Sequence, residues 1–142
     1  MILVSACLTG KNCKYNGGNN LNMKLVEFLK DKEYILVCPE LQAGLGVPRK
    51  PVEIVDNKIK DKEGIDYTNK INKGIDEILE KIDLDKVEYA ILQSRSPSCG
   101  VLNVYDGTFS GKVLEGQGCF AKRLIEKNIK VFDIEKFNFE NN

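Results

Sequence analysis

The sequence predicts an α/β fold: a small, doubly wound and mostly parallel sheet of the Rossmann-like kind, with flanking helices and a small β-hairpin insertion. Short apolar runs that fit buried strands alternate along the chain with longer segments of helical periodicity. This strand–helix–strand order favours parallel strands joined by right-handed crossovers. One further segment alternates apolar and polar residues around an Asp-Asn pair, which is typical of a hairpin.

The elements of the first half follow from the spacing of apolar residues. Residues 2–6 form a short apolar run that is typical of a buried strand. After a loop rich in Gly and Asn, residues 21–30 place their leucines and Phe28 on one helical face. Residues 34–37 form a second apolar run and are predicted to be the second strand. Residues 52–59 alternate and turn at an Asp-Asn pair, so they are predicted to form the hairpin.

The second half continues the alternation. It is expected to contain a helix over residues 67–82, a strand over 88–93, a short strand at 104–105, a helix over 117–127 and a last strand over 130–132. The tail after position 133 is polar apart from Phe137 and Phe139, so we expect it to dock only loosely.

Length and composition fit one domain over residues 1–142 with a real core. Apolar residues make up 42% and charged residues 30%, which is ordinary for a globular protein. The 21 basic residues balance the 21 acidic ones, which argues against a dedicated nucleic-acid coat. The start lacks the basic region of a signal peptide, and nothing approaches the ~18 apolar residues of a membrane span. We therefore expect a cytoplasmic protein without membrane partners.

The chain contains five cysteines: Cys7, Cys13, Cys38, Cys99 and Cys119. In a reducing compartment, clustered cysteines more often indicate metal binding or catalysis than a disulfide framework. None of the five belongs to a CxxC pair, so the usual spacing of a zinc ribbon or a thioredoxin is missing. The chain also contains no histidine, which excludes any mechanism that needs imidazole.

Cys7, Cys38 and Cys99 each follow a different predicted strand. Ligands of parallel α/β sheets bind beyond the carboxyl ends of the strands. Because neighbouring strands are ~4.8 Å apart, loops from three adjacent strands can converge within roughly 10 Å. We therefore expect a shared thiolate site. Cys119, at a helix start, is expected to pack in the core, and Cys13 remains open as a fourth ligand, a redox partner or a bystander.

Three thiolates are compatible with two kinds of metal centre. A catalytic zinc ion keeps one coordination position open, whereas a structural zinc ion takes four protein ligands. An iron–sulfur cube can likewise be held by three cysteines, which leaves one iron free to bind a substrate atom. Thiolates are soft donors that suit either centre, so the residues alone do not separate the two.

Four motifs occur in order: SACLTGKNCKYNGG at residues 5–18, VCPE at 37–40, SPSCG at 96–100 and DGTFSG at 106–111. Together they make nearly the whole chain resemble the thiouracil desulfidase (TudS) family of bacterial and archaeal proteins, in a short form without the second, larger domain of some relatives. The resemblance implies a [4Fe-4S] cluster with three cysteine ligands and one open iron.

The resemblance also assigns roles to individual residues. Cys7, Cys38 and Cys99 would be the cluster ligands. Glu40 would be the catalytic acid or base, and Ser96 a hydroxyl that positions or relays a proton. Two positions depart from the family pattern, since Cys119 adds a thiol without a family role and Asn16 replaces the usual aspartate.

Four other residues are expected to bind substrate: Arg49, Ser98, Phe109 and Ser110. Arg49 could hold a carbonyl or phosphate of the substrate. Phe109 could stack on a base, as aromatic residues do with unpaired bases, and its loop could cap the pocket.

The resemblance implies a non-redox, hydrolytic desulfuration, a reaction of the hydrolase or lyase class. Sulfur would leave as sulfide from a thiolated pyrimidine such as thiouracil or thiouridine, and the zero net charge favours a small molecule over tRNA. Two other functions remain open on the residues alone. One is a redox or sulfur-carrier protein with Cys7 and Cys13 as a reactive pair, and the other is a zinc-stabilised binding domain.

Overall fold

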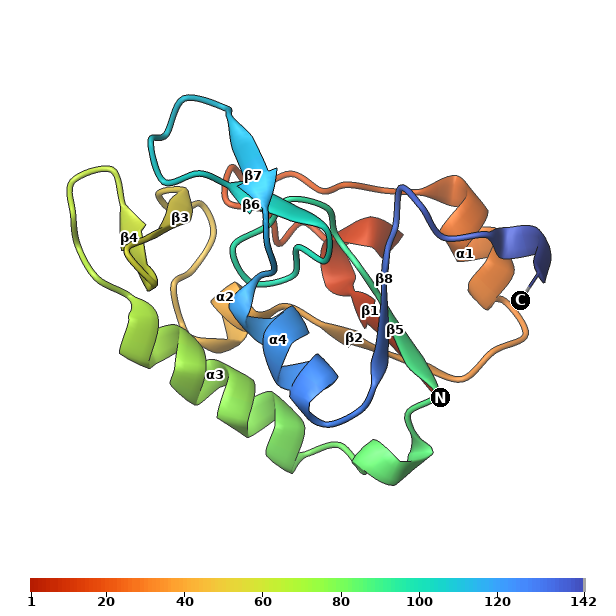
Figure 1. Cartoon of the computed structure of the whole chain (residues 1–142). Helices are drawn as coiled ribbons and strands as arrows, with labels where there is room; N and C mark the ends of the chain where they lie inside the picture. Colours follow the sequence, from red (N-terminus) through yellow and green to blue (C-terminus); the bar gives the residue numbers. More distant parts are fainter. Residues whose placement is uncertain (142) are drawn as a thin grey trace.

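The computed structural model describes residues 1–141, so the last position of the expected domain lies outside the described residues. Its centre is a parallel sheet with the strand order β2-β1-β5-β8 (Figure 1). The strands are β1 (Ile2–Ser5), β2 (Tyr34–Val37), β5 (Tyr89–Leu92) and β8 (Lys130–Asp133). All three strand pairs in this sheet are parallel, which confirms the expected α/β class.

Helices cover both faces of the sheet because its strands are apolar on both sides. Leu3 faces the core that α3 (Thr68–Glu80) and α4 (Cys119–Glu126) share. Its neighbours in β1 belong to a second core, which α1 (Met23–Leu29) covers from the other side (Figure 1). Asn22 begins α1 by accepting a hydrogen bond from the backbone N–H of Leu25 at 3.0 Å.

Two antiparallel hairpins stand beside the sheet. The first pairs β3 (Val52–Val55) with β4 (Lys58–Asp61), as expected from the sequence. Its turn residues Asp56 and Asn57 have φ angles of 51° and 64°, a left-handed conformation that these short polar residues tolerate.

The second hairpin was only half expected. β6 (Asn103–Tyr105) contains the predicted short strand, and it pairs with β7 (Val113–Glu115), which the sequence did not indicate. All three β7 residues are exposed, so no buried face left an apolar pattern.

Short helical segments complete the chain. They are α2 (Pro39–Gln42) and the 3-10 helices η1 (Ala6–Thr9), η2 (Leu84–Lys86) and η3 (Phe139–Asn141). None of the helices within residues 1–141 is long and apolar enough to cross a membrane.

The expectation of a loosely docked tail is wrong. Phe137 is only 7% exposed and packs edge-on against Phe28 of α1 and Phe132 of β8, with ring centroids 5.4 and 5.3 Å apart. Phe139 lies 5.0 Å from Phe137. These aromatic contacts make the tail part of the core beside α1.

Candidate functional site

A cavity of ≈ 730 Å³ opens where the carboxyl ends of β2, β1 and β5 meet. The segments that leave these three strands supply most of its wall, and four cysteines line it: Cys7, Cys13, Cys38 and Cys99. A common site is expected for Cys7, Cys38 and Cys99. All four cysteines are free thiols.

Cys7 lies in η1, directly after the central strand, and its position depends on the loop that ends at Asn20. The backbone N–H of Asn20 donates a hydrogen bond to the Cys7 carbonyl oxygen at 2.9 Å. The side-chain Nδ2 of Asn20 donates to the Cys7 sulfur at 3.4 Å. Asn20 is thus fixed against Cys7 at two points.

Cys38 follows β2 directly and precedes α2, where its carbonyl oxygen accepts the first helical hydrogen bond from Gln42 at 2.9 Å. Cys13, only 2% exposed, lies between Cys38 and Cys7 and hydrogen-bonds to both sulfur atoms. The Cys13 hydrogen bond lowers the pKa of Cys7 and lowers that of Cys38 to about 7. The same two hydrogen bonds raise the pKa of Cys13, so Cys13 keeps the proton.

The Cys99 loop is held by the hydroxyl of Ser96. Its Oγ accepts hydrogen bonds from the backbone N–H groups of Ser98 at 3.2 Å and Cys99 at 3.0 Å. Burial raises the pKa of the Cys99 thiol, although the Ser5 hydroxyl hydrogen-bonds to its sulfur. The loop also packs against Gly118, where a Cβ atom would lie 2.4 Å from the carbonyl carbon of Ser98.

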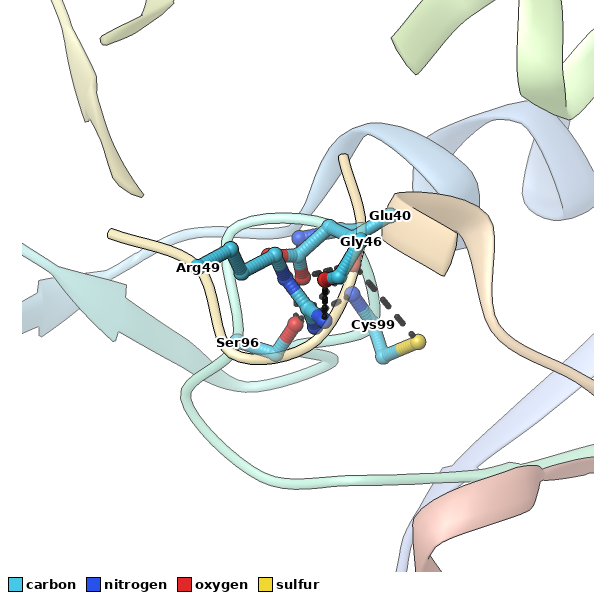
Figure 2. Close-up of polar contacts among 6 residues, drawn as sticks. Glu40, Gly46, Arg49, Ser96 and Cys99 are labelled. Carbon is cyan, nitrogen blue, oxygen red and sulfur yellow. Dashed lines mark hydrogen bonds and ion pairs between the residues drawn. The ribbon is translucent and has the colours of Figure 1, made fainter. Parts of the chain in front are cut away.

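Glu40 and Arg49 adjoin this loop (Figure 2). Ser98 Oγ donates to Glu40 Oε2 at 3.1 Å, and Ser96 Oγ lies 3.1 Å from Ser98 Oγ. Because Ser96 Oγ already accepts two N–H groups, its proton points to Ser98, whose own proton goes to Glu40. The two hydroxyls and the carboxylate therefore form one directed hydrogen-bond chain.

The Arg49 side chain is 7% exposed, and its Nε lies 3.5 Å from Glu40 Oε1. Its Nη1 donates to the Gly46 carbonyl oxygen at 3.0 Å. Nε is buried and has no hydrogen-bond partner among residues 1–141. The atom is closed off from solvent and faces the Glu40 carboxylate, with which Arg49 forms an ion pair.

The remaining predicted residues lie in the loop between β6 and β7. Phe109 lines the cavity, and Glu53 fixes its loop by accepting the backbone N–H groups of Gly107 at 3.0 Å and Phe109 at 3.1 Å. Ser110 is exposed and, within residues 1–141, is not part of the cavity wall. Its hydroxyl lies 2.5 Å from that of Thr108.

Cys119 packs against the core that α3 and α4 share, as expected for a core thiol. Burial raises its pKa to about 12, so it stays protonated at neutral pH. Within the described residues it is not part of the cavity wall.

Comparisons with known proteins agree with this geometry. Residues 2–136 match the model of the 2-thiouracil desulfurase family. The chain belongs to this family. The protein YbbK of Bacillus subtilis (strain 168), itself uncharacterized, is 34% identical over 148 residues, which cover 97% of this chain and 98% of YbbK. A solved structure of the [4Fe-4S]-dependent thiouracil desulfidase TudS superposes with a TM-score of 0.88 at 30% identity, covering 96% of this chain and 91% of that one.

Membership of the 2-thiouracil desulfurase family confirms the expected resemblance and the expected enzyme that acts on C–S bonds of thiouracil-type compounds. The likeness to TudS confirms the expected fold as well.

The donor set fits an iron–sulfur cluster. Three thiols from three strands face one cavity, and soft thiolates are the usual ligands of such clusters. Within residues 1–141, no group of three or more His, Cys, Asp or Glu side chains is already placed to hold a metal ion. Cys7, Cys38 and Cys99 would hold a cluster through one thiolate each.

Sequence reasoning missed three residues of the site: Ser5, Asn20 and Glu53. Ser5 belongs to the motif that contains Cys7, and its place at the end of a strand could have indicated a role. Asn20 and Glu53 carried no such signal, because their contacts join segments that only the fold brings together.

Proposed function

We propose that this chain removes sulfur, as sulfide, from thiolated pyrimidines such as 2-thiouracil in a hydrolytic, non-redox reaction. Cys7, Cys38 and Cys99 would hold a [4Fe-4S] cluster. The observation that supports this most is the position of the three thiols at the ends of three strands, in one cavity with the Glu40 hydrogen-bond chain. The [4Fe-4S] dependence of the TudS neighbour agrees with it.

When bound, the cluster would supply an iron with an open position, a Lewis acid with affinity for sulfur. The chain supplies the proton chemistry. Water replaces sulfur at the ring carbon, so one oxygen is gained, one sulfur leaves, and both protons of water end on the sulfide. Glu40 takes a proton from the attacking water at one carboxylate oxygen and returns it as the C–S bond breaks.

Ser96 and Ser98 orient Glu40 for this task. Their hydroxyls point one after the other to Glu40 Oε2, which fixes the carboxylate beside the Cys99 loop. With no histidine in the sequence, Glu40 is the natural proton carrier of the site.

Arg49 and Phe109 would position the substrate. The Arg49 guanidinium lines the cavity and would donate to a ring carbonyl oxygen of the pyrimidine through a terminal N–H, while its Nε stays paired with Glu40. Phe109 can stack on the ring from the opposite loop. Ser110 stays a weaker candidate, since it reaches substrate only if its loop closes.

The test is a sulfide-release assay on the anaerobically reconstituted enzyme, run in parallel with 2-thiouracil, 4-thiouracil and thiolated tRNA. We expect release from the free bases. Glu40→Gln should keep the brown chromophore and lose at least about 100-fold in turnover, the usual contribution of a general base. Glu27→Gln, an exposed carboxylate on α1, is the matched control. Near-normal turnover of Glu40→Gln would show that Glu40 is not the proton carrier.

A thiol redox function is the second candidate, because the Cys13 thiol hydrogen-bonds to those of Cys7 and Cys38. It predicts a colourless protein that forms a disulfide between two of these thiols under mild oxidation. Iron and acid-labile sulfide in the anaerobically purified protein would exclude it, and zinc would instead favour a structural metal site.

A further inference from the structure

We propose that Asn20, Cys13 and Ser5, none of which binds iron, donate hydrogen bonds to the sulfur atoms of the three cluster ligands and thereby position them and raise the reduction potential of the cluster. This inference rests on the proposed function, since it assigns these residues to the cluster that Cys7, Cys38 and Cys99 would hold.

Asn20 serves Cys7. Its amide Nδ2 lies 3.4 Å from the Cys7 sulfur, and its backbone N–H is tied to the Cys7 carbonyl at 2.9 Å. The second contact fixes the side chain in place, so the amide loses little freedom when it donates to sulfur. Asn20 also lines the cavity, which puts this hydrogen bond at the site itself.

Cys13 serves Cys38. Its thiol is buried and lies within hydrogen-bond reach of the sulfur atoms of both Cys7 and Cys38. Its single proton can donate to only one of them at a time, and because Asn20 already donates to Cys7, Cys13 is available to Cys38. Cys13 does not directly follow a strand of the sheet as Cys7 and Cys38 do, so we place it among the donors to the ligand sulfur atoms and not among the ligands. This assigns a role to Cys13 that the sequence left open.

Ser5 serves Cys99. Its Oγ accepts the backbone N–H of Gln93 at 3.0 Å, so its own proton is free for another acceptor. That acceptor is the Cys99 sulfur, and Ser5 is only 2% exposed. A hydroxyl in this position cannot turn to solvent, and each of the three ligand sulfur atoms therefore has its own donor.

The physical effect follows from the charge on the sulfur atoms. A hydrogen bond withdraws electron density from a thiolate, which stabilises the reduced, more negative state of an iron–sulfur cluster. Removing one donor should therefore shift the midpoint potential to a more negative value without removing iron.

The experiment measures iron content and midpoint potential of the reconstituted protein by a redox titration followed by EPR spectroscopy. Asn20→Ala, Cys13→Ala and Ser5→Ala should each keep the wild-type iron content and show a more negative potential. Cys13→Ser, which restores a donor, should return towards the wild-type value. Asn19→Ala is the matched control, because the Asn19 amide hydrogen-bonds to Asn12 and not to sulfur.

Two results would overturn the proposal: unchanged potentials in the folded alanine variants, or loss of iron from Cys13→Ala, which would make Cys13 a ligand. Circular dichroism shows which variants fold, and any one that fails leaves the other two to decide. A wild-type protein that binds no cluster contradicts the proposed function itself, whereas a wild-type cluster with unchanged variant potentials contradicts only this inference.

Discussion

Replacing Gly118 by alanine tests how the fold positions Cys99. A Cβ atom at this position would lie 2.4 Å from the carbonyl carbon of Ser98, 2.5 Å from its oxygen and 2.9 Å from the Cys99 nitrogen. Ordinary contacts are 3.4–4 Å, so the backbone must move by about 1 Å. It cannot move freely, because the Ser98 carbonyl accepts a hydrogen bond from Phe120 N–H at 2.9 Å and Gly118 N–H donates to Gly100 at 2.8 Å.

The expected cost can be worked out from these contacts. Overpacking of this kind costs about 1–3 kcal/mol, and each strained backbone hydrogen bond adds about 1 kcal/mol. We therefore expect Gly118→Ala to lower the free energy of unfolding by about 3 kcal/mol and to lower the iron content after reconstitution, since Cys99 moves with the loop.

Urea denaturation of the metal-free protein and iron analysis of the reconstituted protein measure both effects. Gly116→Ala is the matched control in the same segment, because its Cβ would meet only side-chain atoms at 3.4 and 3.5 Å. If Gly118→Ala is as stable as Gly116→Ala and binds as much iron, the close packing of α4 on the Cys99 loop does not hold the site together.

Three further predictions concern the rest of the site. Glu53→Ala removes the acceptor for two backbone N–H groups of the Phe109 loop and should raise KM for 2-thiouracil more than it lowers kcat. Equal changes in KM and kcat would show that this loop does not bind the substrate. Arg49→Lys loses the guanidinium that can pair with Glu40 and donate to substrate at the same time, and should raise KM about tenfold, with the cluster absorbance unchanged. In the metal-free protein the pKa of Cys38 falls from 9.0 to about 7, so between these values the folded chain has released a proton that the unfolded chain still holds. The free energy of unfolding should therefore rise from pH 7 to pH 9 and lose this contribution as the pH falls through 7, and Cys38→Ser should abolish that part of the slope in urea denaturation.

Much of the sheet could be predicted because its strands are short apolar runs. The strand expected at residues 34–37 has those bounds in the structure, and the hairpin turns at the Asp-Asn pair that allows positive φ angles. β7 could not be predicted, because all three of its residues are exposed. No alternation of buried and exposed positions marks it, and it is a strand through its backbone pairing with β6. α2, with four residues, is too short to show helical periodicity.

The tail shows a different limit. Two phenylalanines in a polar segment do not reveal a partner, and only the fold brings Phe137 against Phe28 and Phe132. The contact between Phe28 and Phe137 joins residues 109 positions apart, so local sequence carries no trace of it.

Part of the candidate site could be predicted from the sequence and part could not. Cys7, Cys38 and Cys99 could be placed at one edge of the sheet, because each follows a strand and parallel strands end at the same edge. Their hydrogen-bond donors could not, since the contact of Asn20 with Cys7 depends on how the intervening loop folds. The role of Ser96 as an acceptor for two backbone N–H groups also depends on the geometry of its loop.

The central claim is that three thiols at the ends of three strands hold an iron–sulfur cube. Anaerobic reconstitution followed by counting iron and acid-labile sulfide per chain tests it most directly, with Cys7→Ser, Cys38→Ser and Cys99→Ser compared with the core variant Cys119→Ser. The account predicts four iron and four sulfide, the content of a [4Fe-4S] cluster, in the wild type and in Cys119→Ser, and a loss of most of the iron in the other three. Full iron content in any of those three, or zinc in place of iron in the wild type, would contradict it.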